Sequence, residues 1–453
     1  IEKENQGSSD GYIAKYNSDG KNLWTQMFGS SKEDDSEFIK ISDDGSIYVA
    51  GETAGDLGGQ INNYEYSGFI SKFDSSGNVQ WTKLTGDDVS SLEIGDNDSI
   101  YVTGSTQAGN NYISLFNSEG DVLNSEEFSS IEDINTNDIE DLKISSDGSI
   151  VFTGFSNESS YLAKYISSGD ITINQITEPP FDPPTSPEPP SVGNISGGKF
   201  IGNPEGDWIK TLDSEESEFH YNGRHYIELQ SLAIHGDYIY GWGEQEGTLG
   251  PGILVKHDIN GNEIWRESIT DESWIEGDWD LFRAEDISIS SDGSVYVVGQ
   301  TNSEFHDQAT TSWELRDGFI IKYDSTGNRE WTRFLGGSSN DDIEGVVVAR
   351  DGSIYVTGDT DEGILGTGDA HQGAGHISKY NSDGTKEWSQ LINSYQYDDA
   401  EAITVDKDGF IYVTGRTEGT FWDQRLQIEQ ENQGSIEKEN QGSSDGYIAK
   451  YNS

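Results

Sequence analysis

The sequence predicts an all-β fold, a seven-bladed β-propeller in which every blade is a four-stranded antiparallel sheet. Three observations support this prediction. Two short motifs recur along the chain, apolar and small residues alternate within each motif, and a glycine-containing turn divides each motif into two strands. Because two hairpins supply the four strands of a propeller blade, each pair of motifs predicts one blade.

The first motif predicts the outer hairpin of a blade. It reads DGYIAKYNSDGKNLWTQ from Asp10 and DGFIIKYDSTGNREWTR from Asp317. The SDG and STG triplets supply glycine for the positive φ of a tight turn. Further copies start at Ser67, Tyr112, Tyr161, Gly197, Pro251 and Ala374.

The second motif predicts the inner hairpin. It reads FIKISDDGSIYVAGET from Phe38 and ITVDKDGFIYVTGRT from Ile403, and it occurs seven times. Its first strand is the most apolar one, so we expect that strand next to the central channel and the tryptophan strand outermost. The other copies start at Leu92, Leu142, Leu232, Ile287 and Val346.

This assignment of inner and outer hairpins divides the chain into four parts. Residues 1–176 hold a closing hairpin and blades 1–3, residues 177–195 a linker, residues 196–427 blades 4–7, and residues 428–453 a tail. The expected blades are Ser36–Leu84, Ser90–Glu127, Ile139–Ile176, Leu229–Ser268, Ala284–Leu335, Glu344–Leu391, and Ala400–Thr417 completed by Gly11–Phe28.

The two ends of the chain carry the same eighteen residues, IEKENQGSSDGYIAKYNS, at Ile1–Ser18 and Ile436–Ser453. Both copies are candidates for the third strand of blade 7, and pairing of the two chain ends would remove the exposed edge that an open sheet presents. The N-terminal copy continues into the tryptophan strand, so we expect it to close the ring. The C-terminal copy would then be a spare strand for exchange with another molecule, the next repeat of a longer protein, or a duplication of artificial origin.

The proline-rich segment TEPPFDPPTSPEPPSVGNI, residues 177–195, holds seven of the nine prolines and predicts an extended linker. The hairpin Gly197–Leu212 that follows is expected to be surplus, because blade 3 already has an outer hairpin. The linker either leaves and rejoins one seven-bladed ring or separates parts of two propellers. Three blades and four blades add up to seven, which favours the single ring.

The stretches DGYIAKYNSDGKNLW and DGSIYVTG resemble the bacterial SBBP-type β-propeller repeat of large secreted and surface proteins, and they are similar to marine cyanobacterial surface proteins. The resemblance covers most of the chain outside the loops and the proline segment. It implies the propeller fold and an extracellular or cell-surface location. The spacing of Tyr, Gly and Trp is also similar to the tryptophan-docking repeat of quinone-type propellers, but the catalytic residues of those enzymes have no counterpart here.

The composition of the chain limits the classes of partner that it can bind. The chain has 27 Lys and Arg against 83 Asp and Glu, a net charge of −56, which argues against nucleic acid and anionic membranes as partners. It has no cysteine, and no apolar run is long enough to span a bilayer. The chain starts at Ile1 and its one methionine is Met27, so we interpret it as a mature or excised piece.

Ten of the eleven tryptophans, all but Trp242, fall into two groups. The repeat residues Trp24, Trp81, Trp208, Trp265, Trp331 and Trp388 are expected to pack between blades. Four others lie in long loops that we expect on one face, and they are candidates for glycan binding or for local loop packing. These four are Trp274, Trp279, Trp313 and Trp422.

Acidic pairs precede the innermost strands and are expected to ring the channel mouth on the same face. Carboxylates without Lys or Arg partners favour a hard cation, so Ca²⁺ is the one cofactor that the sequence suggests. The alternative is that these residues accept backbone N–H bonds where a strand begins. The candidate ligands are Asp34, Asp35, Asp87, Asp88, Asp341, Asp342, Asp398 and Asp399, with Glu285–Asp286 as a further pair.

The sequence shows no pairing of a nucleophile with a base and no phosphate-binding loop. We therefore expect a non-catalytic secreted or cell-surface module with a structural or adhesive role. The alternatives are a glycan-binding propeller that uses the loop tryptophans and a hydrolase or lyase at the channel mouth. Expected partners are surface glycans or another protein, without nucleic acid and without membrane insertion.

Overall fold

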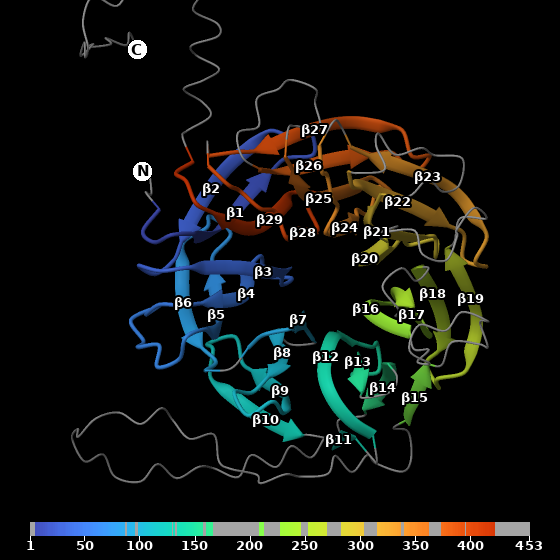
Figure 1. Ribbon diagram of the computed structural model, residues 1–453, viewed down its shortest axis with the longest axis horizontal. Coiled ribbons are helices and arrows are strands. Elements are labelled where there is room, and N and C mark those ends of the chain that lie inside the picture. The colour runs from blue at the N-terminus through green and yellow to red at the C-terminus, as the bar shows by residue number, and fades with distance from the viewer. Residues whose placement is uncertain are drawn as a thin grey trace, which may run out of the picture.

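The computed structural model describes fourteen stretches of the chain. They are residues 5–86, 88–95, 98–128, 130–131, 134–156, 160–165, 208–212, 227–245, 252–269, 282–302, 315–336, 339–361, 373–394 and 396–421. The named secondary-structure elements in these stretches are all β-strands. The described residues contain no helix that is long and apolar enough to cross a bilayer. The strands are arranged in seven sheets around one axis (Figure 1).

The first three blades use the first half of the chain. Blade 1 consists of β3 (Asp34–Ile41), β4 (Ile47–Thr53), β5 (Ser67–Phe73) and β6 (Val79–Leu84). Blade 2 consists of β7 (Ser91–Ile94), β8 (Ile100–Ser105), β9 (Asn111–Phe116) and β10 (Val122–Phe128). Blade 3 consists of β12 (Ile134–Ile144), β13 (Ile150–Ser156), β14 (Ser160–Tyr165) and β15 (Trp208–Leu212), with the short β11 (Ser130–Ile131) beside β12.

The remaining blades follow in chain order, except that the last one uses both ends. Blade 4 consists of β16 (Ile227–His235), β17 (Tyr238–Gln245), β18 (Gly252–Asp258) and β19 (Glu263–Ile269). Blade 5 consists of β20 (Phe282–Ile289), β21 (Val295–Thr301), β22 (Asp317–Tyr323) and β23 (Arg329–Leu335). Blade 6 consists of β24 (Gly345–Val348), β25 (Ile354–Thr360), β26 (Ala374–Tyr380) and β27 (Lys386–Ile392). Blade 7 consists of β28 (Ala402–Val405), β29 (Ile411–Thr417), β1 (Asp10–Tyr16) and β2 (Asn22–Phe28).

The ring is closed, and its strand order is the expected one. The first strand of each inner hairpin lies nearest the axis, and the tryptophan strand lies outermost (Figure 1). Each innermost strand contacts the innermost strand of the next blade, including β28 with β3. The predicted seven-bladed propeller is therefore confirmed.

Blade 7 joins the two ends of the chain. β1 pairs with β29 in an unbroken antiparallel register from Asp10↔Thr417 to Tyr16↔Ile411. β2 then pairs with β1 as the outer strand. The expectation that the N-terminal copy closes the ring is confirmed, and the C-terminal copy lies outside the described residues.

The segment after the proline-rich stretch corrects one prediction. We expected Gly197–Leu212 to be a surplus hairpin, but its last five residues form β15, the outer strand of blade 3, paired with β14 from Ser160↔Leu212 to Lys164↔Trp208. The free edge of β14 accepts only one strand, and the one bearing the repeat tryptophan occupies it. The proline-rich segment, itself outside the described residues, is thus inserted between the third and fourth strands of blade 3.

The repeat tryptophans connect neighbouring blades on the outside of the ring. Trp81 of blade 1 donates its Nε1–H to the carbonyl oxygen of Ser118 in blade 2, at 3.1 Å, and Lys72 Nζ donates to the same oxygen. Gly120, in the same turn at a positive φ of 80°, lies on the Trp81 ring, so a Cβ there would approach the ring to 3.0 Å. Trp331 and Trp388 donate in the same way to the turns of blades 6 and 7. Packing between blades is therefore confirmed for these tryptophans.

We expect the two terminal copies to contribute very differently to stability. Deletion of residues 1–28 removes β1 and β2 and exposes the edge of β29, so the melting temperature should fall by several degrees. Deletion of residues 428–453 should leave it nearly unchanged. Calorimetry of both truncated proteins tests this, and a larger loss from the C-terminal deletion would contradict the closure by β1.

A pair of tryptophan substitutions isolates the hydrogen bond between blades. Trp81→Phe removes a bonded Nε1–H, whereas Trp265→Phe removes an Nε1–H that is buried without a partner. The first change should therefore cost about 1 kcal/mol more than the second in the free energy of unfolding. Denaturant unfolding of both variants measures the difference, and equal losses would show that only ring packing matters.

Candidate functional site

The first residue of each acidic pair has a structural role where the structure describes its contacts. The Asp34 side chain is 1% exposed, and its Oδ2 accepts the backbone N–H of Ser30 at 2.6 Å. The Asp398 side chain is 0% exposed, and its Oδ2 accepts the N–H of Ser394 at 2.6 Å. Asp341 is equally buried, at 2% exposure. Asp34 and Asp398 thus accept backbone N–H bonds, as the alternative interpretation expects, and their role as calcium ligands stays a prediction.

Contacts to the backbone carbonyl of the second residue hold that residue in place in blades 6 and 7. The carbonyl of Asp399 lies directly over Gly415 of β29, so that a Cβ on this glycine would come within 2.1 Å of the oxygen. The hydroxyl of Tyr12 in β1 donates to the same oxygen at 2.8 Å. In blade 6, Gly358 and the Nε2–H of His376 hold the carbonyl of Asp342 in the same way, the latter at 3.0 Å.

Three blades have a further acidic residue, a glutamate two positions after the second residue of the acidic pair. In blade 1, the pairing of β3 with β4 shifts between Ser36 and Phe38, which leaves Glu37 as a bulged residue without a cross-strand partner. The corresponding positions in blades 6 and 7 are Glu344 and Glu401, just before β24 and β28. These glutamates are not among the residues predicted from the sequence, because a bulge interrupts the alternation that indicates side-chain direction.

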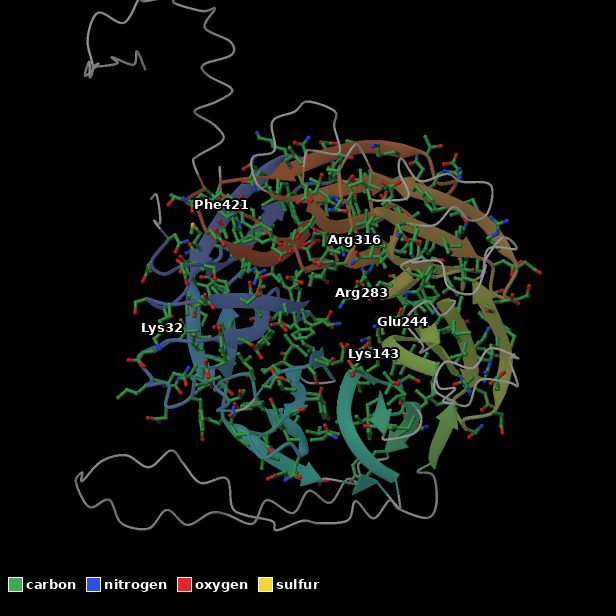
Figure 2. The ribbon with its side chains drawn as sticks, in the orientation of Figure 1. Lys32, Lys143, Glu244, Arg283, Arg316 and Phe421 are labelled. Carbon is green, nitrogen blue, oxygen red and sulfur yellow. The ribbon has the colours of Figure 1, made fainter. Side chains whose placement is uncertain are left out.

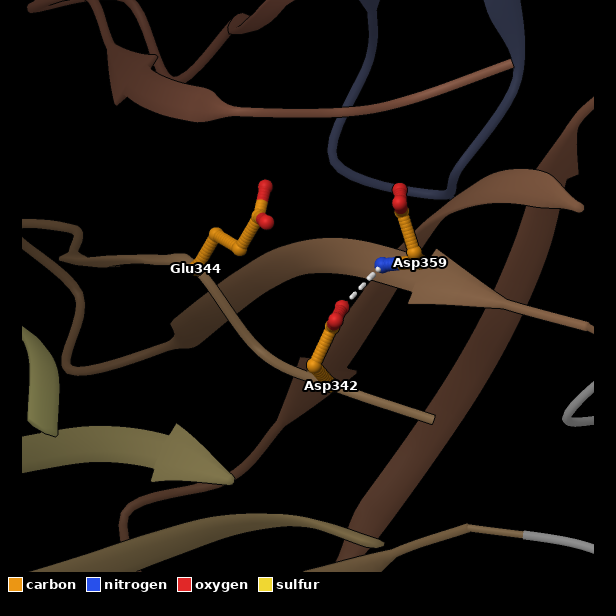
Figure 3. Close-up of side chains that lie close together, drawn as sticks. All are labelled: Asp342, Glu344 and Asp359. Carbon is orange, nitrogen blue, oxygen red and sulfur yellow. Dashed lines mark hydrogen bonds between the residues drawn. The ribbon is translucent and has the colours of Figure 1, made fainter. Parts of the chain in front are cut away.

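Five carboxylates of blades 6 and 7 form one cluster. Carboxylate oxygens of Asp342, Glu344 and Asp359 lie within 4.8 Å of one another (Figure 3). The same limit holds for Glu344, Asp399 and Glu401, so Glu344 belongs to both groups. The backbone N–H of Asp359 donates to Asp342 Oδ1 at 2.7 Å and fixes that side chain (Figure 3). Asp359 is the penultimate residue of β25, the second strand of its blade, and it is not among the residues predicted from the sequence.

The cluster holds more negative charge than its surroundings neutralise. Burial, together with the charges of Asp399 and Glu285, raises the pKa of Asp342 to about 7. Burial, together with neighbouring carboxylates, also raises the pKa of Glu344, Asp359 and Glu401 well above the ordinary range. Such a site either keeps protons or exchanges them for a cation.

Two buried oxygen atoms of the cluster have no hydrogen-bond donor. They are Oδ1 of Asp399, a residue only 4% exposed, and Oε2 of Glu344. The other oxygen of Asp399 lies 3.4 Å from Nε of Arg416, whose Nη1 lies 3.2 Å from Asp35. Because buried polar atoms are normally satisfied, these two oxygens are the ones most suited to bind a ligand.

The other predicted calcium ligands make contacts of their own in the structure, and calcium binding by them stays a prediction. Asp35 pairs with Arg416, and burial raises its pKa to about 6. Asp88 shares a hydrogen bond with Glu52 that raises the pKa of Glu52 to about 8. Asp286 accepts the N–H of Val346 and the hydroxyl of Ser231, and so joins the innermost strands of blades 4, 5 and 6. Asp87 lies outside the described residues.

Basic side chains also lie near the axis. Figure 2 labels Lys143, Arg283 and Arg316 around the centre of the ring. Lys143 pairs with Asp141, and Lys40 with Glu93 at 3.1 Å. These basic groups balance acids of blades 2 and 3, whereas the cluster of blades 6 and 7 keeps its excess charge. The four candidate glycan ligands Trp274, Trp279, Trp313 and Trp422 lie outside the described residues, and their role stays a prediction.

Comparison with known proteins supports the repeat family. Residues 330–366 and 387–421 match the SBBP beta-propeller repeat. The regulatory protein FlaEY of Caulobacter vibrioides is 22% identical over 182 residues, which is 38% of this chain and 17% of FlaEY. The chain therefore spans well under two thirds of that relative.

Solved structures with low sequence identity are also similar. A Lactobacillus plantarum protein has a TM-score of 0.47 at 9% identity, over 84% of this chain and 96% of that one. The periplasmic gluconolactonase PpgL of Pseudomonas aeruginosa has a TM-score of 0.43 at 11% identity, over 85% and 96%. BamB of Moraxella catarrhalis has a TM-score of 0.40 at 11% identity, over 84% and 98%.

The raised pKa of Asp342 predicts a pH dependence of stability. Between the ordinary value of 3.8 and the folded value of about 7, the folded protein holds a proton that the unfolded chain releases. The stabilising contribution of Asp342 to the free energy of unfolding is thus fully present below about pH 4 and is lost as the pH rises through about 7.

Comparison with Asp342→Asn tests this dependence. In the presence of a chelator, the wild type should lose roughly 1–2 kcal/mol of unfolding free energy relative to the variant between about pH 4.5 and about pH 8. Urea unfolding at both pH values measures the difference. A difference that stays constant with pH would contradict the prediction.

Proposed function

We propose that this chain, which carries repeats of the SBBP beta-propeller family, is a non-catalytic secreted or cell-surface module with a structural or adhesive role. In this proposal the cluster of Asp342, Glu344, Asp359, Asp399 and Glu401 binds Ca²⁺ and organises the face on which it lies. The observation that carries the proposal is the convergence of these five carboxylates, with two buried oxygens that lack a donor.

The chemistry of the ligands favours calcium over other metals. All five side chains offer oxygen, and the described part of the cluster contributes neither thiolate nor imidazole as a ligand, which disfavours zinc and copper. Calcium takes six to eight oxygens in a flexible arrangement, whereas magnesium demands near-octahedral geometry. Two groups of carboxylates that share Glu344 suit the larger and more tolerant ion.

The proposed location follows from composition and from the repeat. A net charge of −56 keeps a surface soluble and repels polyanions. Extracellular modules bind Ca²⁺ with dissociation constants of about 0.1–1 mM, so a moderately tight site is sufficient outside the cell. Partners of the cation-bound face are then surface glycans or another protein.

Thermal unfolding with Ca²⁺ and with a chelator tests the metal site. A ligand that binds only the folded state stabilises it by about 2.7 kcal/mol at a hundredfold excess over its dissociation constant. Millimolar Ca²⁺ should raise the melting temperature of the wild type, and Glu344→Gln should abolish this increase because Glu344 belongs to both carboxylate groups. The control Asp19→Asn removes an equal charge from an exposed turn between β1 and β2 and should keep the response.

An unchanged wild-type melting temperature across millimolar Ca²⁺ would contradict the metal site. An equal response of Glu344→Gln and of the wild type would place the ion elsewhere.

One observation favours a hydrolase or lyase as the second candidate. Asp342 has a pKa raised to about 7 and lies near the carboxylate of Asp399, and a carboxyl group that keeps its proton near neutral pH suits general acid catalysis. Aryl glycosides and polysaccharides assayed with the wild type and with Asp342→Asn test this candidate. Turnover that is lost in Asp342→Asn would replace the non-catalytic proposal.

A further inference from the structure

A concave site lies where the ring closes, between blades 7 and 1. It has a volume of about 440 Å³, within the range of small-molecule sites. Its walls come from three separate parts of the chain, namely Ser8 and Ser9 before β1, the loops and strand ends of blade 1, and residues of blade 7. We call it the seam pocket. It is assembled only when the N-terminal hairpin completes blade 7.

The seam pocket is acidic. Five Asp and Glu residues line it, of which Glu52 has a pKa raised to about 8, and its one guanidinium is that of Arg416. Arg416 already pairs with Asp35 at 3.2 Å and with Asp399 at 3.4 Å, and it stacks on the ring of Tyr397 at 5.4 Å. Its charge is therefore already neutralised, so the pocket as a whole repels anions.

Part of this acidic surface is available to a ligand. Glu33 and Glu418 are exposed, and neither has an ion pair among the described residues. The negative charges of Glu33 and Glu418 thus face the same cavity.

An aromatic ring completes the pocket. Tyr66 is 44% exposed, and its hydroxyl donates to Glu33 Oε2 at 2.8 Å, which fixes the orientation of the ring. A fixed aromatic face next to carboxylates is the arrangement that attracts organic cations, because the face of the ring carries negative charge density. A bare metal ion would fill only a small fraction of this volume and would make no use of the ring.

We propose that the seam pocket binds a side-chain-sized organic cation, an alkylammonium or guanidinium group, through Glu33, Glu418 and the ring of Tyr66. A lysine or arginine side chain of another protein and a free polyamine both present this chemistry. The site is distinct from the proposed calcium cluster, since none of these three residues belongs to that cluster.

Isothermal titration of the full chain in saturating Ca²⁺ tests the proposal. The probes are Nα-acetyl-lysine amide, Nα-acetyl-arginine amide and cadaverine, and the neutral control is Nα,Nε-diacetyl-lysine amide. We expect at least one cationic probe to bind with a dissociation constant of about 1 mM or tighter, and the neutral control to show no binding. Preference for an amino-acid amide over cadaverine would indicate a protein side chain, and the reverse preference a free polyamine.

Variants locate the binding site. Glu418→Gln and Tyr66→Ala should each weaken binding by about threefold or more, the range expected for one cation–π or ion-pair contact. Asp19→Asn removes the same charge from the turn between β1 and β2 and should bind like the wild type. Melting temperatures confirm that each variant is folded.

Three results would overturn the proposal. The first is binding of the neutral control as tightly as the cations. The second is the absence of heat for every cationic probe at millimolar concentration. The third is unchanged affinity in both Glu418→Gln and Tyr66→Ala while their melting temperatures stay normal. None of these results bears on the calcium cluster, which the thermal measurements test separately.

Discussion

The structure depends on the pairing of β1 with β29, seven residue pairs that join the two ends of the chain. This ladder completes blade 7, covers the edge of β29 and closes the ring with β28 against β3. It also positions chemistry. Tyr12, a residue of β1, holds the carbonyl of Asp399, and Ser8 and Ser9 form one wall of the seam pocket. One N-terminal segment therefore serves both the stability of the ring and the geometry of its functional face.

Around the axis, backbone packing decides which acids converge. A glycine in the second strand of the blade lets the carbonyl of the preceding acidic residue approach closely, as Gly415 does for Asp399 and Gly358 for Asp342. The side chains that result are buried close to one another, which is unfavourable for like charges. Contacts elsewhere, such as the bond from Trp81 to Ser118 on the rim, hold the ring together against this repulsion. An arrangement that keeps unfavourable carboxylates in place is typical of a binding site rather than of a core.

The sequence predicted the features that are local. Period-two alternation and glycine turns fix the strands, and the spacing of Lys, Gly and Trp fixes how one blade packs on the next, so blade number, strand order and the N-terminal closure were all accessible. The outer strand of blade 3 was missed because β15 reaches β14 from across the proline-rich segment, and no local pattern specifies such a pairing. In the acidic pairs only the second residue faces the cluster, since neighbouring residues of a strand point to opposite sides. Glu344 and Asp359 were missed because a bulge and a strand from the same blade bring them in, and both depend on register.

Arg416 connects the two sites on this face. Its guanidinium lies 3.2 Å from Asp35, which lines the seam pocket, and 3.4 Å from Asp399, which belongs to the carboxylate cluster. At such distances in a partly buried setting, the interaction of unit charges is several-fold stronger than in water. Positive charge added next to Asp399 weakens the attraction that Asp399 exerts on Arg416 and leaves Asp35 as its remaining partner. Arg416 belongs to β29, the strand that pairs with β1 to close the ring. This one side chain therefore contacts both the carboxylate cluster and the seam pocket.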